Sequence, residues 1–97
     1  MRRSYLLVYS DTLGTRDEIK TLLSELEEVV TWRTDLPHSF YLVSDLDASV
    51  LARAIRERRG NRGRFIVTEI SSNKQGWLTP ESWFLINHKK RKPKTAG

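Results

Sequence analysis

The hydrophobic pattern of the chain alternates between a strand period and a helix period, and this alternation predicts its elements. β-branched and aromatic residues concentrate in four short runs that polar or turn-forming residues bound, which is typical of strands. The turn Asp35–His38 separates the second run from the third, so these two are expected to form an antiparallel hairpin. The predicted strands are Ser4–Tyr9, Val29–Thr34, Ser39–Ser44 and Arg64–Ile70.

Two helices are predicted between these strands. The first begins at Thr15, because Thr15 and Glu18 have the spacing of a capping box. The second is capped by Asp45 or Asp47 and stops at Gly60. The apolar residues of the first recur at helical spacing and are Ile19, Leu22, Leu23, Leu26 and Val30. Those of the second are Val50, Leu51, Ala54 and Ile55.

A third helix is expected from Pro80 to about His88. Thr79 is suited to its N-cap, Pro80 to its first position, and Glu81 adds an acid to its first turn. We expect this helix to pack Trp83, Phe84 and Ile86 onto the rest of the domain.

The order of these elements predicts an α+β fold. Two right-handed crossovers around a central hairpin favour a ferredoxin-like β-α-β-β-α-β sandwich with a short C-terminal helix and a basic tail. The first and third strands would be central, with two helices on one face. Residues 1–88 would form this single domain, and residues 89–97 a disordered tail.

Composition narrows the function without defining it. The chain has 97 residues and no Cys, which excludes disulfides, thiolate metal sites and a cysteine nucleophile. No apolar run approaches the roughly 20 residues of a membrane span, and no signal peptide is recognisable, so we expect no membrane association and a cytoplasmic location. Phosphate-binding loops, dinucleotide fingerprints and nucleophile elbows are absent. No complete enzyme signature remains, so whether the chain is an enzyme stays open.

The formal net charge of +5 is concentrated in two segments. One is the C-terminal tail, which carries Lys89, Lys90, Arg91, Lys92 and Lys94. The other is the junction between the second helix and the fourth strand, where Arg58, Arg59, Arg62 and Arg64 alternate with Gly60 and Gly63. Arginines bind phosphate oxygens, and glycines allow backbone amides to approach an anion. The predicted nucleic-acid-binding residues are therefore Arg58, Arg59, Arg62, Arg64, Lys89, Lys90, Arg91 and Lys92. A solvated helix face with a solubilising tail is the alternative.

The predicted topology also gathers polar residues near these arginines, at one edge of the sheet. Asp11 follows the first strand, and Asp35 and His38 lie in the hairpin turn. A carboxylate beside an imidazole can hold a divalent cation or orient a water, which makes Asp11 and His38 candidate catalytic residues. Asp11 is also the candidate ligand for Mg²⁺ or Mn²⁺. Ordinary turn roles for both residues remain the alternative.

Aromatic residues on the first strand suggest a self-association surface. Tyr5, Leu7 and Tyr9 share one face of that strand. They could stack on bases, but the aromatic signature of RNA-recognition modules is missing. We therefore expect them to form a homodimer interface.

Most of the chain, from Tyr5 to about His88, resembles the SinR-like small bacterial proteins, relatives of the smaller CRISPR spacer-acquisition subunit and of VapD-like toxins. The resemblance rests on the order and spacing of Leu7–Asp11, Trp32, Phe40–Leu46, Phe65–Ile70 and Gly76–Leu78. It implies a ferredoxin-like homodimer, with a tyrosine–aspartate pair that closes strand one in the nuclease members, where the aspartate can bind metal. Here Ser10 follows Tyr9, and the acid comes one position later, at Asp11.

Three functional hypotheses follow. The first is a homodimeric, non-catalytic protein that binds DNA or RNA through the arginines and the lysine tail. The second is a nuclease that depends on Mg²⁺ or Mn²⁺ and uses Asp11. The third is a regulatory module whose basic helix end docks on an acidic protein partner.

Overall fold

The computed structural model describes residues 1–93, and its elements follow the order expected from the sequence. Four strands and three helices are present in that part of the chain. They are β1 (Arg3–Tyr9), α1 (Arg16–Glu25), β2 (Thr31–Arg33), β3 (Ser39–Ser44), α2 (Ala48–Arg58), β4 (Phe65–Glu69) and α3 (Pro80–His88). The fold is therefore α+β, as predicted.

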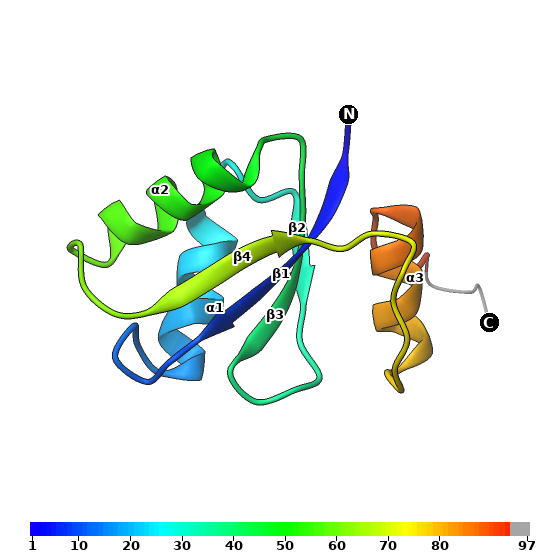
Figure 1. Cartoon of the computed structure of the whole chain (residues 1–97), viewed down its shortest axis with the longest axis horizontal. Coiled ribbons are helices and arrows are strands. Elements are labelled where there is room, and N and C mark those ends of the chain that lie inside the picture. The colour runs from blue at the N-terminus through cyan, green and yellow to red at the C-terminus, as the bar shows by residue number, and fades with distance from the viewer. Residues whose placement is uncertain (94–97) are drawn as a thin grey trace.

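The four strands form one antiparallel sheet in the order β2-β3-β1-β4 (Figure 1). Strand β1 is central, because it pairs with β3 on one side and with β4 on the other. Leu7, for example, lies between Phe40 of β3 and Val67 of β4. The two outer strands, β2 and β4, are the edges of the sheet.

Helices α1 and α2 cover one face of the sheet and bury its main core. Tyr5, Leu7 and Tyr9 point into this core, where they pack with Ile19 of α1 and Leu51 of α2. All three strand residues are buried within the chain itself. They leave no side-chain surface for a second copy, which corrects the expectation that they form a homodimer interface. The even-numbered residues of β1 face the other way.

Helix α3 lies on the opposite side of the sheet from α1 and α2 (Figure 1). Its buried apolar residues are Leu85 and Ile86, which pack against Tyr41 and Val43 of β3. The Ser4 hydroxyl donates to the Ile86 carbonyl at 2.6 Å and ties the helix to β1. Ile86 thus behaves as expected, whereas Leu85 occupies the central position that the sequence assigned to Trp83 and Phe84, both only half-buried.

The capping signals in the sequence fix the helix starts correctly. Thr15 accepts from the Glu18 amide at 3.1 Å, and the Glu18 carboxylate accepts from the Thr15 amide at 2.8 Å, which completes the capping box. Thr79 caps α3 through the Ser82 amide. Asp47 stands at the N-cap of α2, but its carboxylate accepts from Arg3 of β1 instead, at 2.7 Å.

Two apolar positions differ from the predicted stripes. Val30 and Val50 are exposed rather than buried. Helix α1 ends at Glu25 with Leu26 as its C-cap, so Val30 falls beyond the helix, in the approach to β2. Strand β2 is accordingly shorter than the predicted Val29–Thr34.

The last described residues continue from α3 back toward β2. The Lys89 amide closes the helix on the Leu85 carbonyl. Arg91 donates through Nε to the Thr31 hydroxyl at 2.7 Å. Lys94, the last basic residue of the predicted tail, lies outside the described residues. Within residues 1–93, no helix combines the length and the apolar character needed to cross a bilayer.

Candidate functional site

Three loops meet at one end of the strands because backbone hydrogen bonds join them. The Tyr9 amide donates to the His38 carbonyl, and the Ser10 amide donates to the Arg64 carbonyl, each at 3.0 Å. The Arg64 amide in turn donates to the Thr12 hydroxyl at 3.2 Å. The end of β1, the β2–β3 hairpin and the α2–β4 loop therefore form one continuous surface, as the predicted topology required.

Asp11 and His38 form a hydrogen-bonded pair on this surface. Oδ1 of Asp11 lies 2.7 Å from Nε2 of His38. His38 adopts a left-handed backbone conformation, with φ 59°, and its ring packs 5.5 Å from that of Tyr9. The pair is open to solvent, because the Asp11 side chain is 91% exposed and that of His38 is 49% exposed. An imidazole oriented by a carboxylate can accept or deliver a proton, or donate a hydrogen bond to a phosphate.

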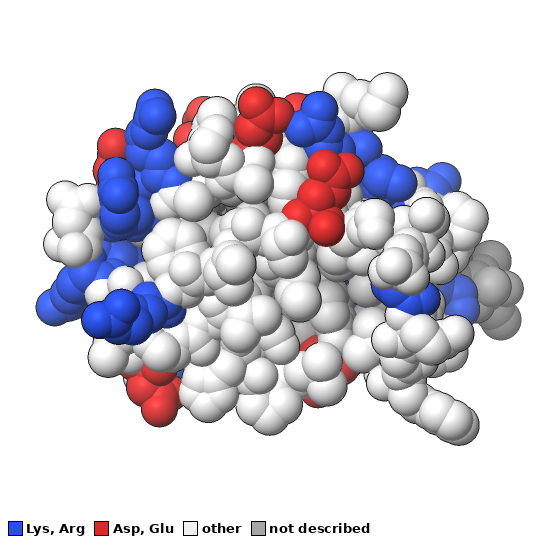
Figure 2. Space-filling model, viewed as in Figure 1, with Lys and Arg blue, Asp and Glu red and all other residues white. Residues whose placement is uncertain are grey.

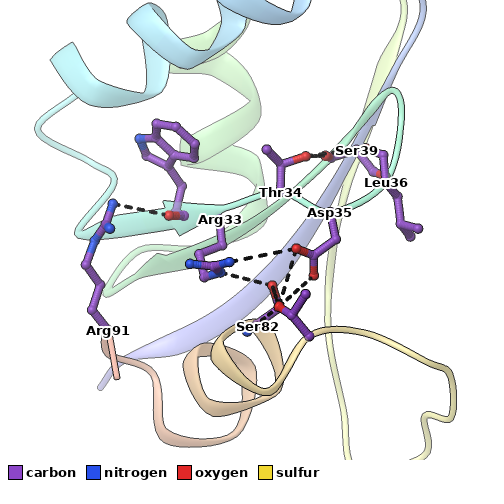
Figure 3. Close-up of polar contacts among 9 residues, drawn as sticks. Arg33, Thr34, Asp35, Leu36, Ser39, Ser82 and Arg91 are labelled. Carbon is purple, nitrogen blue, oxygen red and sulfur yellow. Dashed lines mark hydrogen bonds and ion pairs between the residues drawn. The ribbon is translucent and has the colours of Figure 1, made fainter. Parts of the chain in front are cut away.

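Asp35, expected beside Asp11, lies in a different network (Figure 3). Its carboxylate accepts from the Thr79 hydroxyl at 3.3 Å and lies 3.8 Å from an Arg33 guanidinium nitrogen. Arg33 also donates to the Ser82 hydroxyl at 3.1 Å. These contacts join the end of β2 to the start of α3. Asp35 therefore has a structural partner and contributes no ligand to the loop surface around Asp11.

The side chains of this loop surface do not offer enough ligands for a metal centre held by the protein. Among the described residues Asp11 supplies the one carboxylate of this surface, and the hydrogen bond to His38 already occupies one of the two oxygens. No group of three or more His, Cys, Asp or Glu side chains is arranged to hold a metal ion within residues 1–93. Mg²⁺ usually takes one or two carboxylates together with waters and phosphates, so the protein alone would offer it little.

Of the four predicted phosphate-binding arginines between α2 and β4, two instead hold the helices together. Arg58 donates to the Glu25 carboxylate of α1 at 2.6 Å. Arg59 is 18% exposed, donates through Nε to the Leu13 carbonyl at 2.7 Å and lies 3.6 Å from the Glu18 carboxylate. Both side chains therefore stabilise the packing of α2 against α1 and the preceding loop, a role that the sequence did not indicate.

The side chains of Arg62 and Arg64 are exposed on the same loop surface. Neither side chain has a carboxylate within ion-pair distance among the described residues. Arg64 is fixed by its backbone bonds to Ser10 and Thr12, which leave its guanidinium free to face solvent. These two arginines are the part of the predicted set that the fold presents for binding.

The glycines of this loop serve its packing more than ligand approach. Gly63 has φ 89°, and a Cβ added there would lie 2.5 Å from the Leu13 Cα and 2.9 Å from the Thr12 carbonyl oxygen. Gly60 has φ 69°, with open space around it. The amides of Gly60 and Asn61 donate to carbonyls of α2 and are occupied. The expectation that the glycine amides of this loop approach an anion is thus corrected for Gly60.

The basic tail begins at the other end of the molecule. Figure 1 places α3 opposite the α2–β4 loop along the long axis, which measures 42 Å. Figure 2 shows basic side chains over the α2–β4 end and others toward α3, with a largely uncharged surface between them. Lys90 and Lys92 are exposed, whereas Arg91 contacts β2, and the Lys89 carbonyl accepts from Arg2. The predicted basic residues therefore form two separate groups.

Arg53 and Arg56 were not predicted as site residues, because their charge alone did not separate them from the other surface arginines. They line a groove between α2 and the edge strand β4, with Ala48 and Ala52 beside them. The one further signal in the sequence is the spacing of Ala48 and Ala52, which puts two small residues on one face of the predicted helix.

Comparison with known proteins adds no relative: no family model, curated protein or solved structure matches this chain.

Proposed function

We propose that this protein binds nucleic acid through the phosphate backbone, without catalysis, and that Arg62 and Arg64 are the principal contacts. The observation that carries the proposal is the contrast within the segment 58–64 between α2 and β4, which we call the arginine loop. Arg58 and Arg59 are bound to carboxylates or carbonyls of the chain, whereas Arg62 and Arg64 have no carboxylate partner among residues 1–93. Two exposed guanidinium groups on a fixed loop suit phosphate oxygens, which they can bind in a bidentate manner.

The neighbouring groups support the same ligand. Thr12 and His38 lie on the loops that backbone bonds join to Arg64, and both carry hydrogen-bonding groups suited to phosphate. The pockets described among residues 1–93 are lined by other residues. We therefore infer binding that depends on the backbone rather than on sequence, with Lys90 and Lys92 as a secondary group at the far end of the molecule.

The strand order β2-β3-β1-β4, with every neighbouring pair antiparallel, supports assigning the sheet to the ferredoxin-like sandwich. The resemblance to SinR-like proteins is consistent with that assignment and would bring homodimerisation with it. Since Tyr5, Leu7 and Tyr9 are buried, the apolar sheet surface left for a homodimer is on the opposite face, where Val8 and Ile66 are exposed.

The proposal is tested by reversing the two open charges. In Arg62→Glu/Arg64→Glu, the affinity for labelled duplex DNA and for single-stranded RNA should fall by about tenfold or more, because two attractive phosphate contacts become repulsive. Fluorescence anisotropy at fixed salt measures this loss. The matched control is Arg2→Glu/Lys74→Glu, which changes the net charge equally but away from the arginine loop. Equal losses in both variants would reduce the effect to net charge and contradict the proposed site.

The alternative of a nuclease that depends on Mg²⁺ or Mn²⁺ rests on Asp11 alone. Its carboxylate is paired with His38, and Asp35 is bound near α3, so no second carboxylate side chain of residues 1–93 joins it. We therefore expect labelled DNA and RNA to stay intact during prolonged incubation with the protein and either metal. If cleavage occurs, disappears with EDTA and is abolished by Asp11→Asn, the non-catalytic proposal is wrong.

A further inference from the structure

We propose that the edge of β4 beside α2 is a docking site for an acidic peptide that binds in extended conformation, as an added strand of the sheet. This site is separate from Arg62 and Arg64 and goes beyond the proposed nucleic-acid binding. Three features carry it: an unpaired strand edge, a groove between that edge and a helix, and two arginines without carboxylate partners.

The backbone of β4 offers a free hydrogen-bonding edge. The Ser10 amide donates to the Arg64 carbonyl, and the Ile70 amide donates to the Ser4 carbonyl, so even-numbered residues of this segment bond to β1. Backbone groups alternate in direction along an antiparallel strand, so those of Phe65, Val67 and Glu69 point away from β1. Because β4 is the last strand of the sheet, no strand of the described chain pairs with them. Such an edge is a template for another extended segment.

The surface next to this edge is hollowed. A groove of about 570 Å³ runs between α2 and β4. Small residues of α2 and apolar residues of β4 line it, together with two arginines. These residues are Ala48, Ser49, Ala52, Arg53, Arg56, Phe65, Ile66 and Val67. The short side chains of α2 leave room for the side chains of an added strand on the helix side of the sheet.

The arginines define the charge of the occupant. Arg53 and Arg56 are exposed, and neither forms an ion pair among the described residues. Three residues along a helix span about 4.5 Å, whereas successive same-face side chains of a strand are about 6.6 Å apart. Long arginine side chains can close this difference, so acidic residues at alternate peptide positions can pair with both.

The other face of the added strand would extend the apolar surface of the sheet. On that face Ile66 is 60% exposed. β-branched residues alternating with the acidic ones would pack beside it. The expected ligand is therefore an extended segment in which Glu or Asp alternates with Val or Ile.

A second copy of this chain fits the edge less well. Pairing of β4 with β4 of another copy would bring the same groove residues of both chains together, so arginines would face arginines across the junction. A nucleic acid could meet the arginines, but it has no backbone amides and carbonyls to continue the strand ladder. An acidic peptide satisfies both requirements.

The test uses the full-length ¹⁵N-labelled protein and a terminally blocked heptapeptide that alternates Val and Glu. The expected result is saturable amide shifts centred on Phe65, Val67 and Glu69, with slower hydrogen exchange at these three amides. A peptide of the same length that alternates Val and Lys is the charge-reversed control and should give no saturable shifts. Absence of saturable shifts with the Glu peptide up to millimolar concentration would overturn the proposal.

Two variants separate this site from the arginine loop. Arg53→Glu/Arg56→Glu should weaken peptide binding by about tenfold or more, whereas Arg62→Glu/Arg64→Glu should leave it unchanged. Val67→Pro removes one outward amide while leaving the bonds to β1, and should abolish the exchange protection. The amide spectrum of each variant confirms that it is folded.

The remaining outcomes contradict the proposal. Equal binding of the Lys peptide would remove the charge argument, and displacement of shifts to Arg62 and Arg64 would assign the peptide to the other site. Sedimentation showing that the edge is closed by a second copy would replace the peptide with self-association. Competition of duplex DNA for the same amides would assign the groove to nucleic acid. Failure of peptide binding with intact DNA binding, or the reverse, tells the two proposals apart.

Discussion

Single residues of the arginine loop have different roles that their letters alone do not distinguish. Gly63 allows the loop to approach Leu13, since a Cβ there would meet backbone atoms at 2.5 Å. Gly60 has a left-handed conformation but nothing within 4 Å of an added Cβ. The first glycine therefore secures a close contact between two loops, and the second mainly turns the chain.

This difference predicts unequal costs for the same substitution. Gly60→Ala should cost about 1–2 kcal/mol, the usual penalty for a left-handed L-residue. Gly63→Ala should cost clearly more, because its backbone clash adds to the conformational strain. Urea unfolding followed by circular dichroism measures both. Equal costs in the two variants would contradict the close approach of Gly63 to Leu13.

Sequence rules predicted the helix N-termini correctly, because a capping side chain bonds to the backbone of its own helix. The predicted N-caps are confirmed for α1, with Thr15 and Glu18, and for α3, with Thr79 and Pro80. A capping group reaches only a few residues along the chain, so its partners are visible in the sequence. The same reasoning failed for Arg59. Its partners, the Leu13 carbonyl and Glu18, come together only through packing of α2 against α1, so no local signal marks it as structural.

At the scale of elements, the start of α1 links stability to pH. The Thr15 backbone amide, with the Thr15 side chain next, lowers the pKa of Glu18 below its ordinary value, and Arg59 lowers it further. Because the pKa is lower in the folded state, the ionised carboxylate stabilises the fold above its unfolded-state pKa. This contribution is lost as the pH falls through the lower, folded-state pKa.

Glu18→Gln should therefore lower the melting temperature slightly at pH 7, since the amide keeps a hydrogen bond but loses the charge. The difference should shrink as the pH is lowered below the ordinary carboxyl pKa and vanish below the folded-state value. Thermal unfolding of both proteins between pH 7 and pH 3 measures it. The matched control Glu27→Gln, at an exposed position beyond α1, should show no comparable dependence. A difference that stays constant over this range would exclude the charge as its cause.

The ends of elements were less predictable than their order. Val30 continued the apolar spacing of α1 in the sequence, yet it is exposed beyond the helix, because the chain must turn to pair β2 with β3. The Val30 amide donates to the Val43 carbonyl, a tertiary contact that overrides the helical period.

For the whole molecule, topology predicted which loops meet but not what each side chain does there. The antiparallel order brings Asp11, His38 and Arg64 together at one end of the strands, as expected from the crossovers and the hairpin. It could not show that Asp35 bonds to Thr79, or that the lysines start at the opposite end from the arginines. Those positions depend on where α3 packs, and its single apolar face gave little indication of that.

The salt dependence of nucleic-acid affinity is the most direct test of the proposed binding surface. It should be measured by fluorescence anisotropy for the full chain, for residues 1–88 and for Arg62→Ala/Arg64→Ala. We expect steep salt dependence that largely survives the truncation, with the two substitutions flattening the log–log slope by about two, or one per lost phosphate contact. A slope unchanged by the substitutions, or binding lost only on truncation, would contradict a phosphate site on the arginine loop.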